Sequence, residues 1–324
     1  MNMKKLSLII PCFNEEEAIP IFYREARSVL DSLSHDPEMI FINDGSSDQS
    51  LKVLRELSEK DPAVRYLSFS RNFGKEAAML AGLEASSGDL VAIMDVDLQD
   101  PPSLLPEMIE AIEVEGYDSA ATKRSDRKGE KPVRSFLSRS FYSVINKVSD
   151  IEIVEGARDF RLMNRPMVNA ILSMSENNRF SKGIFEWVGF KTKWFAYPNV
   201  ERSAGETKWS TRKLFGYALN GIMNFSDVPL RLSSWMGIFM TVVSFIVLIG
   251  IVVRRLLFSD PVAGWASTIC VIIFMGGLQM LCLGVLGQYV AKIYVEVKNR
   301  PHFFISEDSE HWNRSGCDRE KRDD

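Results

Sequence analysis

The 324-residue sequence lacks the signatures of several common classes of protein. Its four cysteines lie far apart and form no CxxC pair: Cys12, Cys270, Cys282 and Cys317. Such sparse cysteines exclude a disulfide scaffold and argue against a zinc site built from cysteine. The sequence also contains no GxG tripeptide and no GxxxxGK(S/T) segment, which excludes the dinucleotide fingerprint and the P-loop. Any nucleotide must therefore be held in another way.

Charge is nearly balanced over the whole chain but unevenly distributed along it. The net charge is −4, with 46% hydrophobic and 25% charged residues, a composition typical of folded rather than disordered proteins. Residues 1–122 carry a net charge of −13, whereas residues 123–213 carry +9. An acidic block followed by a basic one indicates a metal on one side of a site and anionic groups on the other.

Two long stretches in the last third contain no charged residue. The first runs from 232 to 253, and the second, which is longer, runs from 261 to 291. At about 1.5 Å per residue the first is roughly 33 Å long, enough to cross a hydrocarbon core of about 30 Å. Buried core helices are the alternative, but they rarely run so long without a charge. We therefore predict transmembrane helices at 232–256 and 261–291.

The basic residues around these stretches predict their orientation. Two lie in the connecting loop, Arg254 and Arg255, and seven flank the pair: Lys208, Arg212, Lys213, Arg231, Lys292, Lys298 and Arg300. By the positive-inside rule, both termini and the whole chain before the first span should be cytoplasmic. The apolar run Leu6–Pro11 is too short for a signal peptide. The chain should therefore be a multi-pass membrane protein with a cytoplasmic domain at 1–207.

The segments that flank the two stretches have different characters. Residues 208–231 are amphipathic, with basic residues at their start, which predicts helices in the headgroup layer, although an ordinary surface helix remains the alternative. Residues 292–324 should form a polar cytoplasmic tail. Within this tail the segment 305–324 has no hydrophobic periodicity, and we expect it to be disordered.

The segment 1–122 alternates between strand and helix patterns. Strands are expected at 6–11, 39–43, 64–69, 90–95 and 119–122, and helices at 15–33, 48–59, 75–86 and 102–115. Such repeats predict an α/β fold whose mostly parallel, Rossmann-like sheet carries helices on both faces. Ligands of these sheets bind at the carboxyl ends of the strands. The loops that matter thus begin at Pro11, Asn43, Ser70 and Asp95.

The segment Asp95-Val96-Asp97-Leu98-Gln99 is the clearest chemical signal. Three oxygen-bearing side chains alternate at a strand end and can project to one side. Oxygen ligands of this kind suit Mg²⁺ or Mn²⁺. The alternative is a helix cap with solvated carboxylates before the two prolines that follow. Because the segment follows a buried strand and has three polar companion loops, we favour the metal site.

The companion loops add candidate nucleotide contacts. Asp44 stands at a strand end, where its carboxylate could accept from a base N–H or a ribose hydroxyl, although a turn with a helix cap also explains part of this loop. Arg71 and Lys75 flank Gly74 next to the acidic loop. They are either plain surface charges or, as we expect from this position, phosphate ligands.

In this order the four loops resemble those of the inverting glycosyltransferases of family 2, which have the GT-A fold. The two C-terminal apolar stretches make the resemblance closer to the polyisoprenyl-phosphate hexosyltransferases, which include bactoprenol glucosyltransferases and dolichol-phosphate mannose synthases. No QxxRW motif, typical of the polymerising branch of the family, is present, so a polymerase is disfavoured.

The resemblance implies roles for individual residues. The nucleotide-sugar residues would be Pro11, Asn14, Glu15, Asp44, Arg71, Lys75 and Asp95, and the metal ligands Asp95, Asp97 and Gln99. The acceptor phosphate would meet Arg124, Arg134, Ser138, Arg161 and Lys208, and the catalytic residues would be Asp159, Arg161 and Asp97. In the relatives the acid at the position of Asp159 is discussed as the base. Two departures are mild: Thr207 replaces the usual Ser, and Asn43 replaces the first Asp of the common DDGS.

The resemblance also implies a reaction. A hexose, which we expect to be glucose from UDP-glucose, would pass to the phosphate of undecaprenyl phosphate at a bacterial inner membrane, with Mg²⁺ or Mn²⁺ as cofactor. Other donors, such as GDP-mannose or UDP-GlcNAc, are alternatives within this chemistry. A non-catalytic membrane scaffold or transporter is the alternative outside it, but transport is disfavoured because neither stretch contains an ionisable residue that would mark a path.

Nucleic acid and a second copy of the chain are the two macromolecular partners to consider. A basic face is also typical of nucleic-acid binding, but the acidic first third and the two spans argue against that partner. A homo-oligomer is possible, since the glycines of the second stretch permit close contact between helices.

Overall fold

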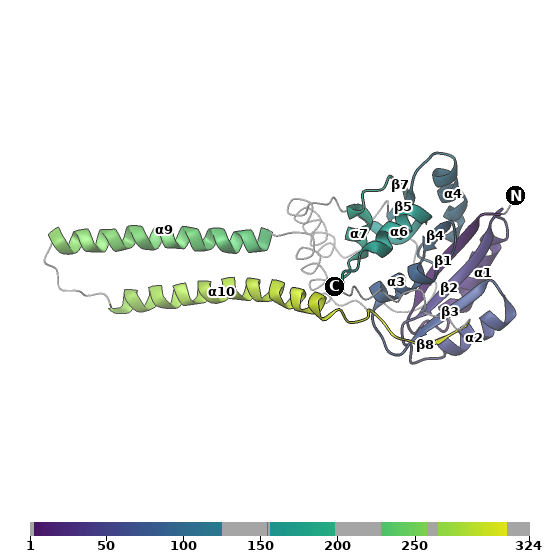
Figure 1. The fold of residues 1–324 in the computed structure, drawn as a ribbon, viewed down its shortest axis with the longest axis horizontal. Helices are drawn as coiled ribbons and strands as arrows, with labels where there is room; N and C mark the ends of the chain where they lie inside the picture. Colours follow the sequence, from purple (N-terminus) through teal and green to yellow (C-terminus); the bar gives the residue numbers. More distant parts are fainter. Residues whose placement is uncertain (1–2, 125–153, 155, 198–227, 258–264, 310–324) are drawn as a thin grey trace, which may run out of the picture.

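The computed structural model describes residues 3–124, 154, 156–197, 228–257 and 265–309, which form one α/β domain and two long helices (Figure 1). The elements in chain order are β1 (Lys5–Cys12), α1 (Ala18–Leu30), β2 (Asp36–Asn43), α2 (Ser50–Lys60), β3 (Val64–Phe69), α3 (Lys75–Ala85), β4 (Leu90–Ile93), a 3₁₀ turn (Pro102–Leu104), α4 (Leu105–Glu113), β5 (Ser119–Arg124), β6 (Ala157–Asn164), α6 (Arg165–Ser173), α7 (Ser181–Trp187), β7 (Thr192–Tyr197), α9 (Val228–Leu257), α10 (Trp265–Lys298) and β8 (Ile305–Asp308).

The strands form one sheet in the order β7-β5-β6-β4-β1-β2-β3-β8. Pairing is parallel between β1 and β2, β1 and β4, β2 and β3, and β5 and β7. Strand β6 is antiparallel to both of its neighbours, and β8 is antiparallel to β3. The prediction of a GT-A-like, mostly parallel sheet is therefore confirmed. Because β1 to β4 run in one direction, their carboxyl ends share one edge of the sheet.

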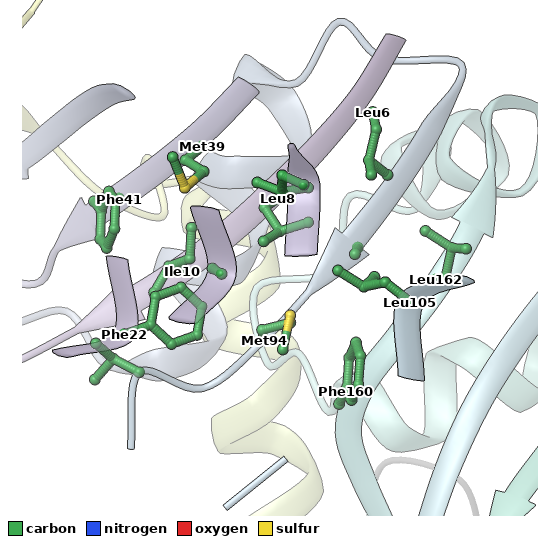
Figure 2. Packing of buried hydrophobic residues seen from close by; sticks show 14 of the residues in the cluster. Leu6, Leu8, Ile10, Phe22, Met39, Phe41, Met94, Leu105, Phe160 and Leu162 are labelled. Atoms are coloured by element: carbon green, nitrogen blue, oxygen red, sulfur yellow. The ribbon is translucent and has the colours of Figure 1, made fainter. Parts of the chain in front are cut away.

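Both faces of the sheet are covered by helices, as a parallel sheet requires. One apolar cluster joins the sheet to α1, α2 and α4, and Figure 2 shows Leu8 and Ile10 of β1 in it, with Ile10 next to Phe22 of α1. The other cluster joins the opposite face to α3, α6 and α7, and there Ile9 of β1 is buried. Strand β1 thus alternates its side chains between two cores and lies at the centre of the domain.

Helix α3 approaches the sheet unusually closely. A Cβ atom at Gly82 would lie 2.1 Å from Cγ2 of Ile9, so only a glycine allows this contact. The helix begins at Lys75, directly after the loop that follows β3. Close packing of α3 on β1 therefore holds Lys75 near the carboxyl edge of the sheet.

The expectation of disorder throughout residues 305–324 was wrong for the first of them. Residues Ile305–Asp308 form β8, and Phe303 just before it is 1% exposed. The paired residues are far apart in sequence, for example Leu67 and Asp308, so no local pattern reveals them. Strand β3 would otherwise present unpaired backbone N–H and C=O groups at the sheet edge, and β8 satisfies them. Residues 310–324 lie outside the described part of the chain.

Helices α9 and α10 extend away from the domain side by side (Figure 1). Their windows Leu230–Val247 and Phe274–Lys298 are long and apolar enough to cross a membrane by length and composition. Helix α9 nearly matches the predicted span at 232–256. Helix α10 begins at Trp265, slightly after the predicted 261, and continues to Lys298 instead of ending at 291. Of the predicted interfacial segment 208–231, only residues 228–231 are described, and they belong to α9.

Glu38 lies near the start of β2, at the end of the sheet opposite the carboxyl edge, and it makes several contacts. It is 4% exposed, forms ion pairs with Lys5 (2.9 Å) and Arg65 (3.2 Å), and accepts from Ser7 Oγ (2.5 Å) and Ser87 N (2.9 Å). Burial alone would raise the pKa of Glu38, but hydrogen bonds from Lys5, Ser7 and Ser87 lower it to about 2. Glu38 thus stays ionised in the folded domain.

This pKa predicts how stability depends on pH. A carboxylate whose folded pKa is depressed stabilises the fold above its unfolded pKa of about 4.3, and that contribution of about 3 kcal/mol is lost as the pH falls toward 2. Glu38→Gln should therefore lower the melting temperature at pH 7, and the difference from wild type should shrink between about pH 4.5 and 2. Melting curves across this range test it. A difference that is independent of pH would contradict the assignment.

Candidate functional site

Polar loops meet at the carboxyl edge of the sheet, after β1, β2, β3 and β4. The register pairs Cys12 with Asn43 and Asn43 with Ser68, so these three strands end side by side. From the other half of the sheet, antiparallel β6 brings its first residues to the same edge, with Ile93 opposite Arg161. The site is therefore assembled from both halves of the domain.

A row of four alternating charges crosses this edge, and we call it the charge row: Asp95, Lys75, Asp159 and Lys182. Lys75 Nζ lies 2.5 Å from Asp95 Oδ1 and 2.8 Å from Oδ2, and it also donates to Asp159 Oδ2. Lys182 Nζ lies 3.8 Å from Asp159 Oδ1 and donates to the carbonyl of Ala157 at 2.8 Å. Asp95 comes from the loop after β4, Lys75 from α3, Asp159 from β6 and Lys182 from α7.

The charge row keeps Asp159 and Lys75 ionised. Burial alone would raise the pKa of Asp159, but the ammonium groups of Lys75 and Lys182 outweigh it and hold that pKa well below its usual range. Burial would likewise lower the pKa of Lys75, but Asp159 and Asp95 raise it. At neutral pH Asp159 is therefore a fixed anion between two cations, and a weak proton acceptor.

The predicted metal ligands lie in the loop after β4. Asp95 and Asp97 offer carboxylate oxygens and Gln99 an amide oxygen, the donor type that Mg²⁺ and Mn²⁺ prefer. Between them Leu98 has φ 54°, a left-handed conformation that costs a non-glycine residue energy, and its side chain packs against the core. Among the described residues, no group of three or more His, Cys, Asp or Glu side chains could hold a metal alone. The donors thus fit a cation that takes its other ligands from a bound phosphate.

The predicted nucleotide residue Asp44 is engaged with the protein itself. It is 4% exposed and accepts from the backbone N–H groups of Phe73 (2.7 Å) and Gly74 (2.9 Å). Next to it, Gly45 has φ 66°, and a Cβ there would lie 2.3 Å from the backbone carbon of Arg71. The β2 loop therefore supports the β3 loop, and the contact of Asp44 with a nucleotide stays a prediction.

The loop after β1 is tied to the loop after β2. Asn14, with φ 54°, donates its N–H to Ser46 Oγ at 2.9 Å and accepts from Ser47 N at 2.8 Å. Glu15 donates its N–H to Ser50 Oγ at 2.9 Å. Pro11 lies on β1, paired with Ile42. The structure thus ties Asn14 and Glu15 to the loop that follows Asp44, and the contact of Pro11, Asn14 and Glu15 with a nucleotide stays a prediction.

The prediction that Arg161 contacts the acceptor phosphate does not fit its position. Arg161 is 3% exposed, donates to Glu186 at 2.8 Å, and lies 4.8 Å from the ring centre of Phe185 and 5.4 Å from that of Trp194. Alternation along β6 places it on the same face as Asp159 but deeper under α7. Arg161 therefore holds α7, which carries Lys182, instead of reaching the open edge.

Two contributions to the site were missing from the sequence prediction. Lys182 has no motif around it and is separated from Asp159 in the chain by the whole of α6, so only the fold reveals it. Asp100 is buried and accepts from Arg158 Nε (3.0 Å) and from the Tyr197 hydroxyl. Burial raises the pKa of Asp100 to about 7, although Arg158 counteracts it. These contacts bind the loop after β4 to β6 and β7.

The predicted acceptor residues are only partly visible. Arg124 is the last residue of β5, and its N–H donates to the Gly156 carbonyl at 3.1 Å. Arg134, Ser138 and Lys208 lie outside the described residues. Their contact with a phosphate stays a prediction.

The sheet and its polar edge are those of a GT-A-like fold. The profile described as Glycosyl transferase family 2 matches residues 7–172. The chain is 44% identical over 301 residues to the SfII prophage-derived bactoprenol glucosyl transferase of Shigella flexneri, covering 93% of this chain and 97% of that protein. It is also 44% identical to the prophage bactoprenol glucosyl transferase homolog of Escherichia coli strain K12, covering 93% and 98%. The chain therefore belongs to glycosyl transferase family 2, and it is a glycosyltransferase.

Solved structures are more distant. Mannosyl-3-phosphoglycerate synthase from Rubrobacter xylanophilus has a TM-score of 0.46 and 15% identity, covering 68% of this chain and 72% of that one. Glucosyl-3-phosphoglycerate synthase from Mycobacterium tuberculosis, solved with Mn²⁺ and UDP-glucose, has a TM-score of 0.44 and 18% identity, covering 68% and 77%. Scores this low say nothing about the ligands of this chain.

The support of the β3 loop by Gly45 can be tested with a matched glycine. A Cβ at Gly45 meets the backbone of Arg71 and Asn72, whereas at Gly116, with φ 75°, nothing lies within 4 Å. Both alanine variants strain the backbone, but only Gly45→Ala should displace the loop, lowering glycosyl transfer on the order of 10- to 100-fold. Gly116→Ala should transfer normally. Equal activity of the two variants would contradict the assignment.

Proposed function

We propose that this glycosyltransferase moves glucose from UDP-glucose onto the phosphate of a membrane polyprenyl phosphate, which is undecaprenyl phosphate in a bacterium. The observation that supports this chemistry is the charge row together with the Asp95–Gln99 loop. The oxygen atoms of this loop could hold a metal ion, and the lysines of the charge row beside it could hold phosphates. The named activity of the relatives at 44% identity supports the acceptor and the sugar.

The donor would bind at the Asp95 end of the charge row. Asp95, Asp97 and Gln99 would hold Mg²⁺ or Mn²⁺, which when bound neutralises charge on the departing diphosphate. Lys75 is the cation nearest to Asp95, so it can pass from that carboxylate to a phosphate oxygen when the donor arrives. Arg71, which lies four residues before Lys75 in the loop after β3, would contact the same diphosphate.

The acceptor would bind on the other side of Asp159. A phosphate monoester has a second pKa near 6, so most of it carries no proton to remove at pH 7. Asp159 then serves as the anion that orients Lys75 toward the donor and Lys182 toward the acceptor phosphate. An acceptor oxygen that attacks the anomeric carbon in line with the leaving diphosphate inverts its configuration and gives a β-linked product from an α-linked donor.

Helices α9 and α10 would place this chemistry at the membrane surface. As two spans, with seven flanking basic residues against two in the loop, they keep the domain and both termini in the cytoplasm. A polyprenyl phosphate presents its phosphate at this surface. The localisation that follows is the inner membrane of a bacterium.

One assay tests the proposal. Purified protein is mixed with undecaprenyl phosphate, Mg²⁺ or Mn²⁺, and labelled UDP-glucose, GDP-mannose or UDP-GlcNAc, and label in the organic phase is counted. Lipid-linked glucose is expected, and the absence of lipid-linked label with every donor would refute the transferase proposal.

The metal ligands are tested with two variants. Asp97→Asn should lose transfer and bind Mn²⁺ more weakly, as measured by electron paramagnetic resonance. Asp31→Asn, which changes an exposed acid directly after α1, should keep both transfer and Mn²⁺ binding.

The pH profile distinguishes the two roles of Asp159. Because Lys75 and Lys182 hold its pKa far below neutrality, Asp159 should not titrate between pH 5 and 9. The value of kcat/KM should instead fall at acidic pH as the acceptor phosphate takes up its second proton, with a midpoint at about pH 6. Asp159→Asn should lower activity on the order of 100-fold while leaving that midpoint unchanged. An acidic fall that disappears in Asp159→Asn would make this residue the general base.

A further inference from the structure

The chain returns to the catalytic domain after the second long helix. Helix α10 ends at Lys298, and the segment Phe303–Asp308, which we call the strap, crosses to the sheet edge (Figure 1). Glu307 in the strap binds Arg55 through two hydrogen bonds of 2.6 and 2.5 Å and accepts from the Tyr66 hydroxyl at 2.7 Å. The strap is thus firmly attached to α2 and β3.

The two aromatic residues of the strap contact the segment that leads into the donor loop. We define the donor loop as Ser70–Gly74. The ring of Phe303 stacks on Phe69 at 4.9 Å with an interplanar angle of 16°. The carbonyl of Phe304 accepts from Ser70 N at 2.9 Å, and its ring lies 6.2 Å from that of Phe73. The strap therefore meets the donor loop at its first residue and again at Phe73.

Phe73 connects these contacts to the charged residues. The guanidinium carbon of Arg71 lies 4.0 Å from the ring centre of Phe73, and the ring of Phe69 meets it edge-on at 5.7 Å. Asp44 accepts from the N–H of Phe73 at 2.7 Å. The backbone of Phe73 is thus held by Asp44, and its ring lies against the strap. Lys75 of the charge row follows shortly after Phe73 in the chain.

The end of α10 is attached to the domain at a second point. Glu296 accepts from Asn177 N at 2.8 and 3.0 Å, from Asn177 Nδ2 at 3.1 Å and from Asn178 N at 3.2 Å. These asparagines lie between α6 and α7, the helix that carries Lys182. The last turn of α10 and the strap together connect α10 to the two segments that lead into the helices of Lys75 and Lys182, the two lysines of the charge row.

We propose that the strap is part of the donor site, with Phe304 as a positioning residue that holds Phe73 and, through it, Arg71 and Lys75. This inference rests on the proposed function in taking the donor to be a nucleotide sugar. A loop without regular structure loses conformational freedom when its charges gather around a diphosphate. Packing by the strap removes part of that freedom beforehand and so strengthens donor binding. Acceptor binding does not depend on it.

Phe304 allows the positioning role to be separated from folding. It is 53% exposed, so its removal costs little buried area, unlike that of Phe303. Phe304→Ala removes the aromatic ring that contacts Phe73. Phe304→Tyr keeps this ring and adds only a hydroxyl group to a side chain that is already half exposed. Val114→Ala, which truncates a 77% exposed side chain after α4, is the matched control for loss of an exposed apolar group.

The measurements use the full-length chain in detergent. Titration calorimetry with UDP-glucose and Mn²⁺ should give about tenfold weaker binding for Phe304→Ala and wild-type binding for Phe304→Tyr and Val114→Ala. The KM for undecaprenyl phosphate should be the same in all four proteins. Hydrogen exchange of the Phe73 and Gly74 amides should be faster in Phe304→Ala, with exchange in β1 unchanged.

The outcomes separate this inference from the proposed function. A wild type that transfers glucose, together with Phe304→Ala that binds UDP-glucose normally, would refute the role of the strap alone. In Phe304→Ala, an equal rise in the Kd for UDP-glucose and in the KM for undecaprenyl phosphate, with a matching loss of thermal stability, would mean that the strap only stabilises the fold. That result would also refute the positioning role. A wild type that neither binds nor transfers any nucleotide sugar would instead refute the proposed function.

Discussion

Attraction between alternating charges organises the catalytic edge of this protein. Asp95, Lys75, Asp159 and Lys182 come from four parts of the chain, and each of these partly exposed charges lies beside one of opposite sign. The same attraction holds the pKa of Asp159 well below its usual range, so this residue stays ionised at neutral pH. Much of the surrounding structure, including the burial of Arg161 under α7, maintains the spacing of this row.

The loops around the charge row support one another in layers. The β1 loop is tied to the β2 loop through Asn14, and the β2 loop supports the β3 loop through Asp44 and Gly45. The strap lies against the β3 loop through Phe304. Several residues that a motif would assign to a ligand therefore act on the backbone of the next loop. Such support limits movement of the few side chains left to meet a substrate.

The segregation of charge along the chain fits this arrangement. The acidic first third contains the Asp95–Gln99 loop, while the basic middle third supplies Lys182 and the predicted acceptor contacts. The two apolar helices follow both, and the strap then joins the end of the second helix to the acidic third. The domain of this family 2 glycosyltransferase is thus attached to the end of α10 through the strap and through Glu296.

Local patterns in the chain predict the α/β alternation, the polar loops at the strand ends, the Asp95–Gln99 segment and the two apolar helices. These features follow from periodicity and from motifs that span only a few residues. The folded structure was needed to show that Lys182 joins Asp159, that Arg161 is buried against Glu186, and that Ile305–Asp308 form β8. Each of these depends on contacts between segments that lie far apart in the chain, most of all the pairing of Leu67 with Asp308. No local pattern encodes which distant segment will satisfy a buried charge or an open sheet edge.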